Sequence, residues 1–491
     1  MVNSVLVLGG GSAGFLAAVT LKSRLPQLPV TVLRSPDIGI IGVGEGTTNG
    51  VPIHLHGYLK LYVAEFYRLA DPIWKLGIRF LWGQRPFFDY IFGHQLDTKY
   101  ELLRKDTGFY CDDGPLDYIG VQSGLMTHNA VFPRDGSGRP IPPESFAYHL
   151  ENEKFVSYLE TVAARLGVVV QDGTVTEVLQ DEAGITGLRL ASGATAAADL
   201  YVDSSGFASV LLGKALQEPF ISFRPSLFCD RAVVGGWPRG TEPIKPYTTA
   251  ETMAAGWCWQ IDHEHRLNRG YVYSSAFIAD ADAEAEFRAK NPLVGPTRIV
   301  KFKSGRYERG WVKNVVALGN SSGFVEPLES TSLAAICTQA QGVAETLRDC
   351  DGLLAPSLIK QYNKRNARSW DTIRQFLAVH YKFNTRLDTP FWRACRADAD
   401  LCSAHDIVEY FQDNGPSVAW RVTLIEQGDQ FNMEGYLSML VGQQVPYRRR
   451  YVPEEGEQAA WLAIRTAIRK KASRAFSVSE GLQLVRQPNW V

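Results

Sequence analysis

Apolar residues at the start of the chain change their spacing twice, and this change predicts a βαβ unit. Residues 4–8 contain a short run of Val and Leu that is typical of a buried parallel strand. Apolar residues then follow a helical spacing from residue 15 to residue 21, and Pro26 ends the pattern. A second run at residues 30–33 completes the predicted unit of strand, helix and strand.

The remaining pattern predicts many short strands up to residue 338 and mostly helices beyond it. Predicted strands cover residues 73–80, 168–170, 175–179, 188–190, 200–202, 256–264, 271–275 and 314–318. Predicted helices cover residues 59–69, 147–166 and 457–476, and another helix follows residue 332. Residues 83–144 are rich in aromatic residues, Pro and Gly and weakly periodic, which predicts a long excursion over a substrate pocket.

The composition is that of an enzyme-sized protein with almost no net charge. The 491 residues, 45% hydrophobic and 21% charged, are enough for two closely joined domains. The 51 Lys and Arg residues balance 52 Asp and Glu residues, so we expect no nucleic-acid partner. Seven cysteines without CxxC spacing predict reduced thiols, a cytoplasmic location and no metal site. The apolar start lacks a preceding Lys or Arg, and we expect neither a signal peptide nor a membrane span.

The sequence GGGSAG at residues 9–14 lies between the first strand and the first helix. In this context GxGxxG predicts dinucleotide binding. Gly9, Gly11 and Gly14 then allow a tight turn, close approach of a pyrophosphate, and close packing of helix on strand. Arg34 replaces the acidic residue that would bind the ribose at the end of the second strand. We expect Arg34 to stack on adenine or to contact phosphate, unless the ribose is held in another way.

Two further loops place small residues around a carboxylate. Residues 41–49 read IGVGEGTTN, and the glycines beside Glu45 predict a backbone that passes close to a planar ligand. Residues 319–332 read GNSSGFVEPLESTS and join a buried strand to a helix N-terminus, which predicts a cofactor site. Pro327 turns the chain and sets Glu329 as a fixed carboxylate beside hydroxyls and free backbone N–H groups. A plain loop with a capping Glu also explains this stretch.

Lys75 lies between a Trp and a Leu in an apolar, strand-like segment. Such a Lys is either a snorkelling residue at an edge or a partly buried ammonium donor aimed into a cavity. In the predicted strand at residues 256–264, alternation places Trp257, Trp259 and Ile261 on one face. These side chains would form a flat wall that excludes water.

Three histidines have simple structural interpretations. We interpret His149 as a hydrogen-bonding residue of the core rather than a catalyst. Strand alternation brings His263 and His265 to one face but supplies no third ligand, so we expect no metal site there.

Four motifs together resemble the flavin-dependent tryptophan halogenase family. They are the glycine fingerprint with GVGEGT at residues 42–47, the Lys75 segment, the tryptophan wall, and residues 319–332. The resemblance spans about residues 4 to 335 and is looser in the C-terminal helices. It implies an α/β fold with a Rossmann-like FAD-binding domain of the flavin monooxygenase type, an interleaved β-sheet and a mostly helical C-terminal substrate region. The implied domains are residues 1–345, with 83–146 as the pocket-covering excursion, and residues 346–491.

The resemblance also implies a reaction and residue roles. In that family FADH2 reacts with O2 to a C4a-hydroperoxide, halide attacks it, and hypohalous acid moves through a tunnel to an aromatic substrate. Lys75 and Glu329 match the pair that holds the oxidant and takes the proton from the ring. Thr331 and Ser332 match the backbone N–H groups near the halide, and the tryptophan wall matches residues beside the flavin. The residues matched to cofactor binding are Gly9, Gly11, Ser12, Ala13, Gly14, Arg34, Gly44, Glu45, Gly46, Thr47, Val175, Asn320 and Leu333.

The chain departs from the family pattern at three places. Asp262 replaces a Pro after the tryptophan wall, Ser332 replaces a Gly, and residues 431–436 lack the paired tyrosines that grip the amino acid part of tryptophan. We therefore expect a free indole, or another electron-rich aromatic alone or on a larger molecule, to be halogenated with chloride or bromide. With one dinucleotide fingerprint in the chain, the implied FADH2 comes from a separate flavin reductase. The interpretation allows a homodimer, and the alternatives are a flavin-dependent aromatic hydroxylase and a non-catalytic flavin-binding protein.

Overall fold

The chain folds into two compact units that are interleaved along the sequence. The computed structural model describes residues 1–39, 44–93, 103–105, 107–111 and 114–487. Unit 1 comprises Met1–Asp71, Leu150–Phe223 and Phe302–Asp371, and unit 2 comprises Pro72–His149, Arg224–Lys301 and Thr372–Val491. This division cuts across the expected domains 1–345 and 346–491, because the chain enters each unit three times.

A six-stranded sheet forms the centre of unit 1, in the order β21, β22, β13, β1, β2 and β9. All pairings are parallel except that of β21 with β22. The strands are β1 Val5–Leu8, β2 Val30–Arg34, β9 Val169–Asp172, β13 Leu200–Asp203, β21 Trp311–Val312 and β22 Val315–Ala317. Helix α1 (Ser12–Arg24) connects β1 to β2, so the predicted βαβ unit is confirmed.

Three loops meet at one edge of this sheet because parallel strands end together. Leu8 lies beside Asp203, and Asp203 lies beside Ala317, each at the carboxyl end of its strand. The glycine fingerprint, the loop at Ser204 and the loop at Gly319 therefore leave neighbouring strands. Ligands of open α/β sheets bind at this edge.

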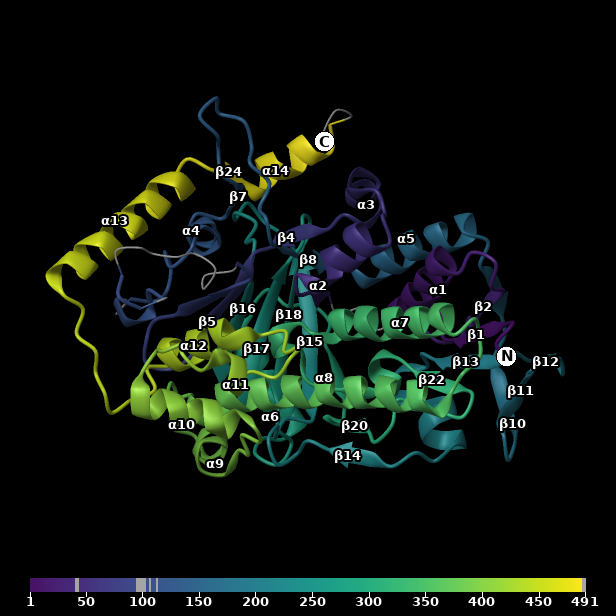
Figure 1. The fold of residues 1–491 in the computed structure, drawn as a ribbon. Helices are drawn as coiled ribbons and strands as arrows, with labels where there is room; N and C mark the ends of the chain where they lie inside the picture. Colours follow the sequence, from purple (N-terminus) through teal and green to yellow (C-terminus); the bar gives the residue numbers. More distant parts are fainter. Residues whose placement is uncertain (40–43, 94–102, 106, 112–113, 488–491) are drawn as a thin grey trace. The chain divides into compact units, whose positions relative to one another are not determined.

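Helices and two small sheets complete unit 1. Helix α1 packs against α5 (Asn152–Arg165) and α7 (Ser332–Asp349), which lie beside it in Figure 1. The other helices are α2 Gly50–Pro52 and α3 Val63–Ala70. The small sheets contain β10 Val175–Asp181, β11 Gly184–Leu190 and β12 Thr195–Ala196, and β14 Phe220–Ser222, β20 Gly305–Tyr307 and β23 Gly323–Phe324. Strand β3 comprises Glu45–Gly46.

A seven-stranded sheet forms the centre of unit 2, in the order β19, β15, β18, β17, β16, β5 and β6. Its strands are β5 Gly77–Leu81, β6 Phe88–Ile91, β15 Arg231–Pro238, β16 Thr248–Met253, β17 Gly256–Asp262, β18 Arg266–Tyr273 and β19 Arg298–Lys301. Only the pairing of β5 with β16 is parallel. Beside it, β4 (Ile73–Lys75) pairs with β8 (Ala147–Leu150), and β7 (Ala130–Phe132) with β24 (Phe476–Ser477).

The C-terminal part of the chain is mostly helical, as predicted. Helix α8 (Pro356–Phe383) begins in unit 1 and ends in unit 2. The other helices of unit 2 are α4 Val121–Thr127, α6 Asp280–Lys290, α9 Pro390–Asp398, α10 Ala404–Asn414, α11 Arg421–Leu424, α12 Asn432–Gly442, α13 Glu455–Ala472 and α14 Val478–Val485. Within the described ranges, no helix combines the length and the apolarity that a bilayer span requires.

Two predicted helices begin later in the chain than the sequence pattern predicts. The helix expected from residue 147 begins only at α5, since the buried residues of β8 pair with β4 instead. The helix expected from residue 59 begins at Val63, because a π-helical turn (Ile53–Tyr58) precedes it and Lys60 adopts a left-handed φ of 59°.

Other boundaries differ where long-range pairing decides them. The last predicted helix stops at Ala472, and Phe476 then pairs with β7. The excursion predicted for residues 83–146 contains β6, α4 and β7 and is more regular than expected. Its residues 94–102, 106 and 112–113, and the start of the GVGEGT motif at Gly42, lie outside the described residues.

Candidate functional site

The glycine fingerprint forms a cradle in which two glycines are required by packing and one leaves space. A Cβ at Gly9, where φ is +124°, would lie 2.4 Å from the Ser204 carbonyl oxygen. A Cβ at Gly14 would lie 1.9 Å from the Gly9 oxygen, whereas one at Gly11 would meet nothing within 4 Å. Gly9 and Gly14 thus allow helix, turn and neighbouring loop to pack, and Gly11 keeps the mouth of the turn open.

The N-terminus of α1 is suited to an anion. Its N-cap is Gly11, no side chain caps it, and its first turn carries no acidic residue. The first backbone N–H groups of a helix without a side-chain cap can bind phosphate oxygens, and the helix dipole favours negative charge there. The residues present therefore fit the pyrophosphate of a dinucleotide cofactor.

Arg34 is engaged in two ion pairs. Its Nε donates to Asp172 at 2.8 Å, and Nη1 donates to Glu160 at 2.9 Å. The first of these hydrogen bonds is the main reason that the pKa of Arg34 is raised. Asp172 ends β9, beside Arg34 at the end of β2. Asp172 is not among the residues predicted for this site, and its signal in the sequence is the Asp-Gly pair at the end of the strand.

The Glu45 loop contains a buried carboxyl. Gly44 adopts a φ of +72°, and Thr47 is fully buried. Burial raises the pKa of Glu45 to about 7, although a hydrogen bond with Asn152 acts in the opposite direction. Within the described residues, the Glu45 Oε2 atom is buried without a hydrogen-bond partner.

The loop after β22 is held to helix α7 by a side-chain network. The Gly319 N–H donates to Gln339 Oε1 at 2.8 Å, and Gln339 Nε2 donates to Ser322 and Asn366, each at 2.8 Å. The Ser321 hydroxyl donates to the Gly206 carbonyl at 3.1 Å. The Ser321 and Ser322 hydroxyls thus help to fix the loop itself. Of the other predicted cofactor residues, Asn320 is half-buried in this loop, Leu333 is buried in α7, and Val175 begins β10.

Glu329 is a fixed, buried carboxylate, as Pro327 suggested. It ends a 3₁₀ turn (Pro327–Glu329), is 1% exposed, and precedes Ser330 in a left-handed conformation with φ of 57°. A positive φ at a residue other than Gly is sustained only where the surroundings impose it. Thr331 then forms the N-cap of α7 without a side-chain cap, and the first turn, which starts at Ser332, carries no acid. This helix start is also suited to an anion.

Lys75 is fully buried, so the snorkelling interpretation is wrong. It is 0% exposed at the end of β4, and its Nζ lies 5.1 Å from the centroid of the Phe92 ring. Lys75 pairs with Ala147, which places it on the opposite face of the ladder from Tyr148. A fully buried Lys is rare in proteins and is a candidate for function.

The tryptophan wall lies in β17 as predicted. Trp257, Trp259 and Ile261 are all buried, and the two indole centroids are 6.0 Å apart. Gly270 on β18 lies opposite Trp259, and a Cβ there would be 2.0 Å from that ring. Asp262, the departure from the family pattern, accepts hydrogen bonds from Arg239, the Lys245 N–H and Gln260 at 2.8, 3.0 and 2.9 Å.

The predicted pairing of His263 with His265 is wrong. Strand β17 ends at Asp262, so alternation does not extend to either residue. His263 is fully buried, whereas the His265 side chain is 78% exposed.

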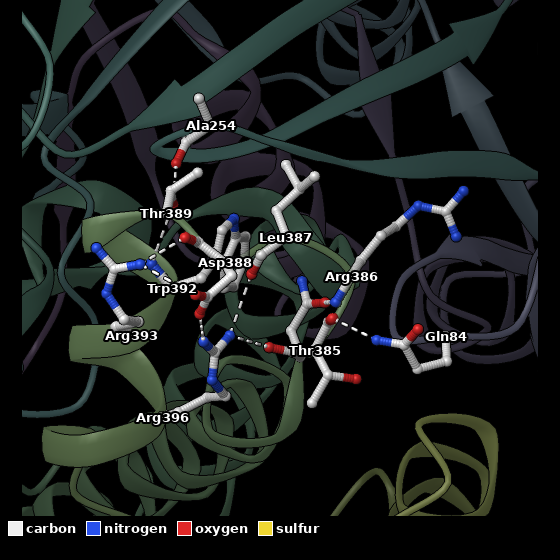
Figure 2. A network of polar contacts seen from close by, with 11 residues as sticks. Gln84, Ala254, Thr385, Arg386, Leu387, Asp388, Thr389, Trp392, Arg393 and Arg396 are labelled. Carbon is white, nitrogen blue, oxygen red and sulfur yellow. Dashed lines mark hydrogen bonds and ion pairs between the residues drawn. The ribbon is translucent and has the colours of Figure 1, made fainter.

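A polar network fixes helix α9 to the turn between β16 and β17 (Figure 2). The Thr389 hydroxyl donates to the Ala254 carbonyl at 2.6 Å and accepts the Trp392 N–H at 3.4 Å. The Trp392 indole N–H donates to Met253 at 2.8 Å, and its ring stacks on Tyr381. Trp392 is therefore a core residue that anchors α9 beside the strand that carries the tryptophan wall.

The region expected to hold paired tyrosines is filled by its own aromatic side chains. Phe431 stacks on Phe376 with ring centroids 3.8 Å apart, and Tyr436 meets Phe376 edge-on. Gln375 donates to the Tyr436 hydroxyl at 3.2 Å. Each of these side chains is at most 5% exposed.

The structure distributes the predicted residues over both units. Glu329, Thr331, Ser332 and the cofactor residues belong to unit 1, and Lys75 and the tryptophan wall belong to unit 2. That the two sets act on one reaction stays a prediction. The fold and these residues together define an α/β protein with a dinucleotide cradle and a buried lysine.

Comparison with known proteins identifies the family. The family model described as tryptophan halogenase matches residues 4–455. The tryptophan 7-halogenase KtzQ of Kutzneria sp. (strain 744) is 34% identical over 425 residues, which cover 80% of this chain and 79% of that protein. The chain belongs to the tryptophan halogenase family.

Solved structures agree with this assignment. MibH, a lathipeptide tryptophan 5-halogenase, is 40% identical with a TM-score of 0.91, and the match covers 99% of this chain and 94% of MibH. BrvH, a flavin-dependent halogenase from Brevundimonas sp. BAL3, is 28% identical with a TM-score of 0.84, over 98% and 99% of the two chains. The predicted family, α/β fold class and enzyme class, a flavin-dependent halogenase, are confirmed.

Proposed function

We propose that this protein halogenates the indole ring of its substrate with chloride or bromide, using FADH2 and O2. The observation that carries the proposal is the complete burial of Lys75 on β4. Removing an ammonium group from water costs several kcal/mol after relaxation, a cost that a merely structural residue would avoid. An ammonium in a water-poor site can hold and polarise an O–halogen bond strongly.

Unit 1 supplies the cofactor and halide contacts. The open mouth at Gly11 and the α1 N-terminus would hold the FAD pyrophosphate, with the loops at residues 44–47 and 319–320 beside it. The bound reduced flavin would supply, with O2, the oxidising equivalents that turn halide into hypohalous acid. The N–H groups at Thr331 and Ser332 would hold the halide, since the α7 N-terminus has no side-chain cap.

The remaining residues would direct the oxidant to carbon. Lys75 would bind the hypohalous acid and orient its halogen toward the ring. Glu329, fixed by its turn, would accept the proton that the ring loses when the halogen has added. Trp257 and Trp259 would keep water from the oxidant, because both indoles are buried.

A separate flavin reductase would deliver FADH2 by diffusion. We propose that the substrate is an indole ring without free amino and carboxylate groups. Phe431 and Tyr436 fill the region where the family's paired tyrosines would hold those groups. The 40% identity to MibH, a lathipeptide halogenase, supports a tryptophan within a peptide as one form of this substrate. The family assignment does not favour the aromatic hydroxylase that the sequence left as an alternative.

The test is a mass-spectrometric product assay with purified protein, FAD, a flavin reductase, NADH, air and each halide. The panel contains indole, tryptophan and a tryptophan-containing peptide. We expect halogenated indole or peptide that depends on the reductase, and hydroxylated products without halogen would favour the alternative. Lys75→Ala should abolish halogenation and leave flavin oxidation intact, whereas the exposed-site control Lys364→Ala should retain both.

A further inference from the structure

His149 lies on the same face of the β4/β8 ladder as Lys75. The register pairs Ile73 with His149 and Lys75 with Ala147, so Lys75 and His149 are diagonal neighbours. Diagonal residues of an antiparallel pair lie about 7–8 Å apart, within reach of long side chains. Both residues are 0% exposed.

The hydrogen bonds of His149 fix its tautomer. Its Nδ1 lies 3.2 Å from the Asp262 carbonyl oxygen, and its Nε2 lies 2.9 Å from the Thr248 hydroxyl. A carbonyl oxygen can only accept, so Nδ1 carries the proton. In the neutral ring Nε2 then accepts from Thr248, which leaves both ring nitrogens satisfied in a fully buried position.

The groups around His149 disfavour a charge on it. Burial is the main reason that the pKa of His149 lies well below its ordinary value. The charges of Lys75, His263 and Arg239 lower it further, and the hydrogen bond to the Asp262 carbonyl acts in the opposite direction. A negative group nearby, the Asp262 carboxylate, is already bound to Arg239 at 2.8 Å and to two other donors. His149 meets the carbonyl of Asp262, not its carboxylate.

We propose that His149 is a positioning residue for Lys75. Its imidazole ring is neutral and held in one tautomer, and it fills the position next to Lys75 on the same face of the β4/β8 pair. Lys75 therefore carries the positive charge on that face. The inference rests on the proposed function of Lys75. It goes beyond the interpretation of His149 as a core hydrogen-bonding residue, because it links the ring to the reactive ammonium. A protonated or mobile ring would repel the ammonium or let it move away from the oxidant.

Two variants separate positioning from a merely structural role. His149→Gln can donate its amide N–H to Asp262 and accept from Thr248 with its amide oxygen, whereas His149→Leu does neither. If His149 positions Lys75, His149→Leu lowers kcat about 10- to 100-fold with KM nearly unchanged, and His149→Gln stays within roughly threefold of wild type. His54→Leu is the matched control, since His54 is also buried and lies 2.9 Å from a Thr hydroxyl, that of Thr20. It should lower thermal stability without this kcat loss.

A spectroscopic measurement tests the ring independently of turnover. In the full-length protein with 15N-labelled histidine, the His149 signals, assigned by their loss in His149→Gln, should show a protonated Nδ1 and a bare Nε2 that do not titrate between about pH 6 and about pH 8. A titrating ring, the opposite tautomer, or equal kcat for both variants would overturn the inference. Failure of the proposed function looks different: either the wild type gives no halogenated product, or Lys75→Ala halogenates as well as the wild type, and in both cases the state of the His149 ring is unaffected.

Discussion

Replacing Glu45 with Gln should stabilise the protein at alkaline pH and have little effect at acidic pH. The Glu45 carboxyl is buried, and its Oε2 atom has no hydrogen-bond partner within the described residues. Gln has nearly the same shape, cannot ionise, and can keep the hydrogen bond with Asn152. The substitution therefore removes the cost of a buried charge and leaves the packing of this loop almost unchanged.

The magnitude follows from the pKa of Glu45. Burial raises this pKa from 4.5 to about 7 in the folded protein. Between these values the folded state holds a proton that the unfolded state has released, so the free energy of unfolding falls as the pH rises. The penalty is below about 1 kcal/mol at pH 5 and reaches about 3 kcal/mol at pH 8, from about 1.4 kcal/mol for each pKa unit. Gln should recover most of it at pH 8.

The assay is thermal unfolding of wild type and Glu45→Gln at pH 5 and pH 8. For a folding unit of roughly 200 residues, 1 kcal/mol shifts Tm by about 2–4 °C, so the gain at pH 8 should be about 5–10 °C. Comparing the two proteins at each pH cancels other titrating groups, and the exposed Glu182→Gln serves as the control. An equal Tm difference at both pH values, or a lower Tm of Glu45→Gln at pH 8, would refute the assignment of a buried carboxyl with a pKa near neutrality.

Three further predictions follow from packing and capping. Gly14→Ala should unfold the fingerprint or lower Tm strongly, because its Cβ would lie 1.9 Å from the Gly9 oxygen. Gly11→Ala should keep the wild-type Tm but lose affinity for FAD, which flavin fluorescence measures. Gly270→Ala should destabilise by about 1–3 kcal/mol or more and change Trp fluorescence by displacing the Trp259 ring, and Gly456→Ala, which meets nothing within 4 Å, should not. Thr389→Val should cost about 1 kcal/mol in denaturant unfolding, because it removes the N-cap of α9 and the bond to Ala254, and Thr389→Ser should restore most of it.

The sequence by itself determined the features that depend on neighbouring residues. The βαβ start and its glycine fingerprint are local, because strand period, helix period and turn chemistry all appear within about 30 residues. The turn at Pro327 that fixes Glu329 and the shared face of Trp257 and Trp259 are local for the same reason. Motif resemblance then gave the family and the enzyme class, which the comparisons confirm.

Only the tertiary structure decided the features that depend on residues far apart in the chain. His149 was expected in a helix, yet pairing of β8 with β4 places it in a strand beside Lys75. Arg34 and its partner at the end of β9 are 138 residues apart, and Trp259 and the glycine opposite it are 11 residues apart. No local pattern predicts such contacts. The choice between an exposed and a buried Lys75 also needed the fold, since burial depends on what packs over a strand and not on the strand's own sequence.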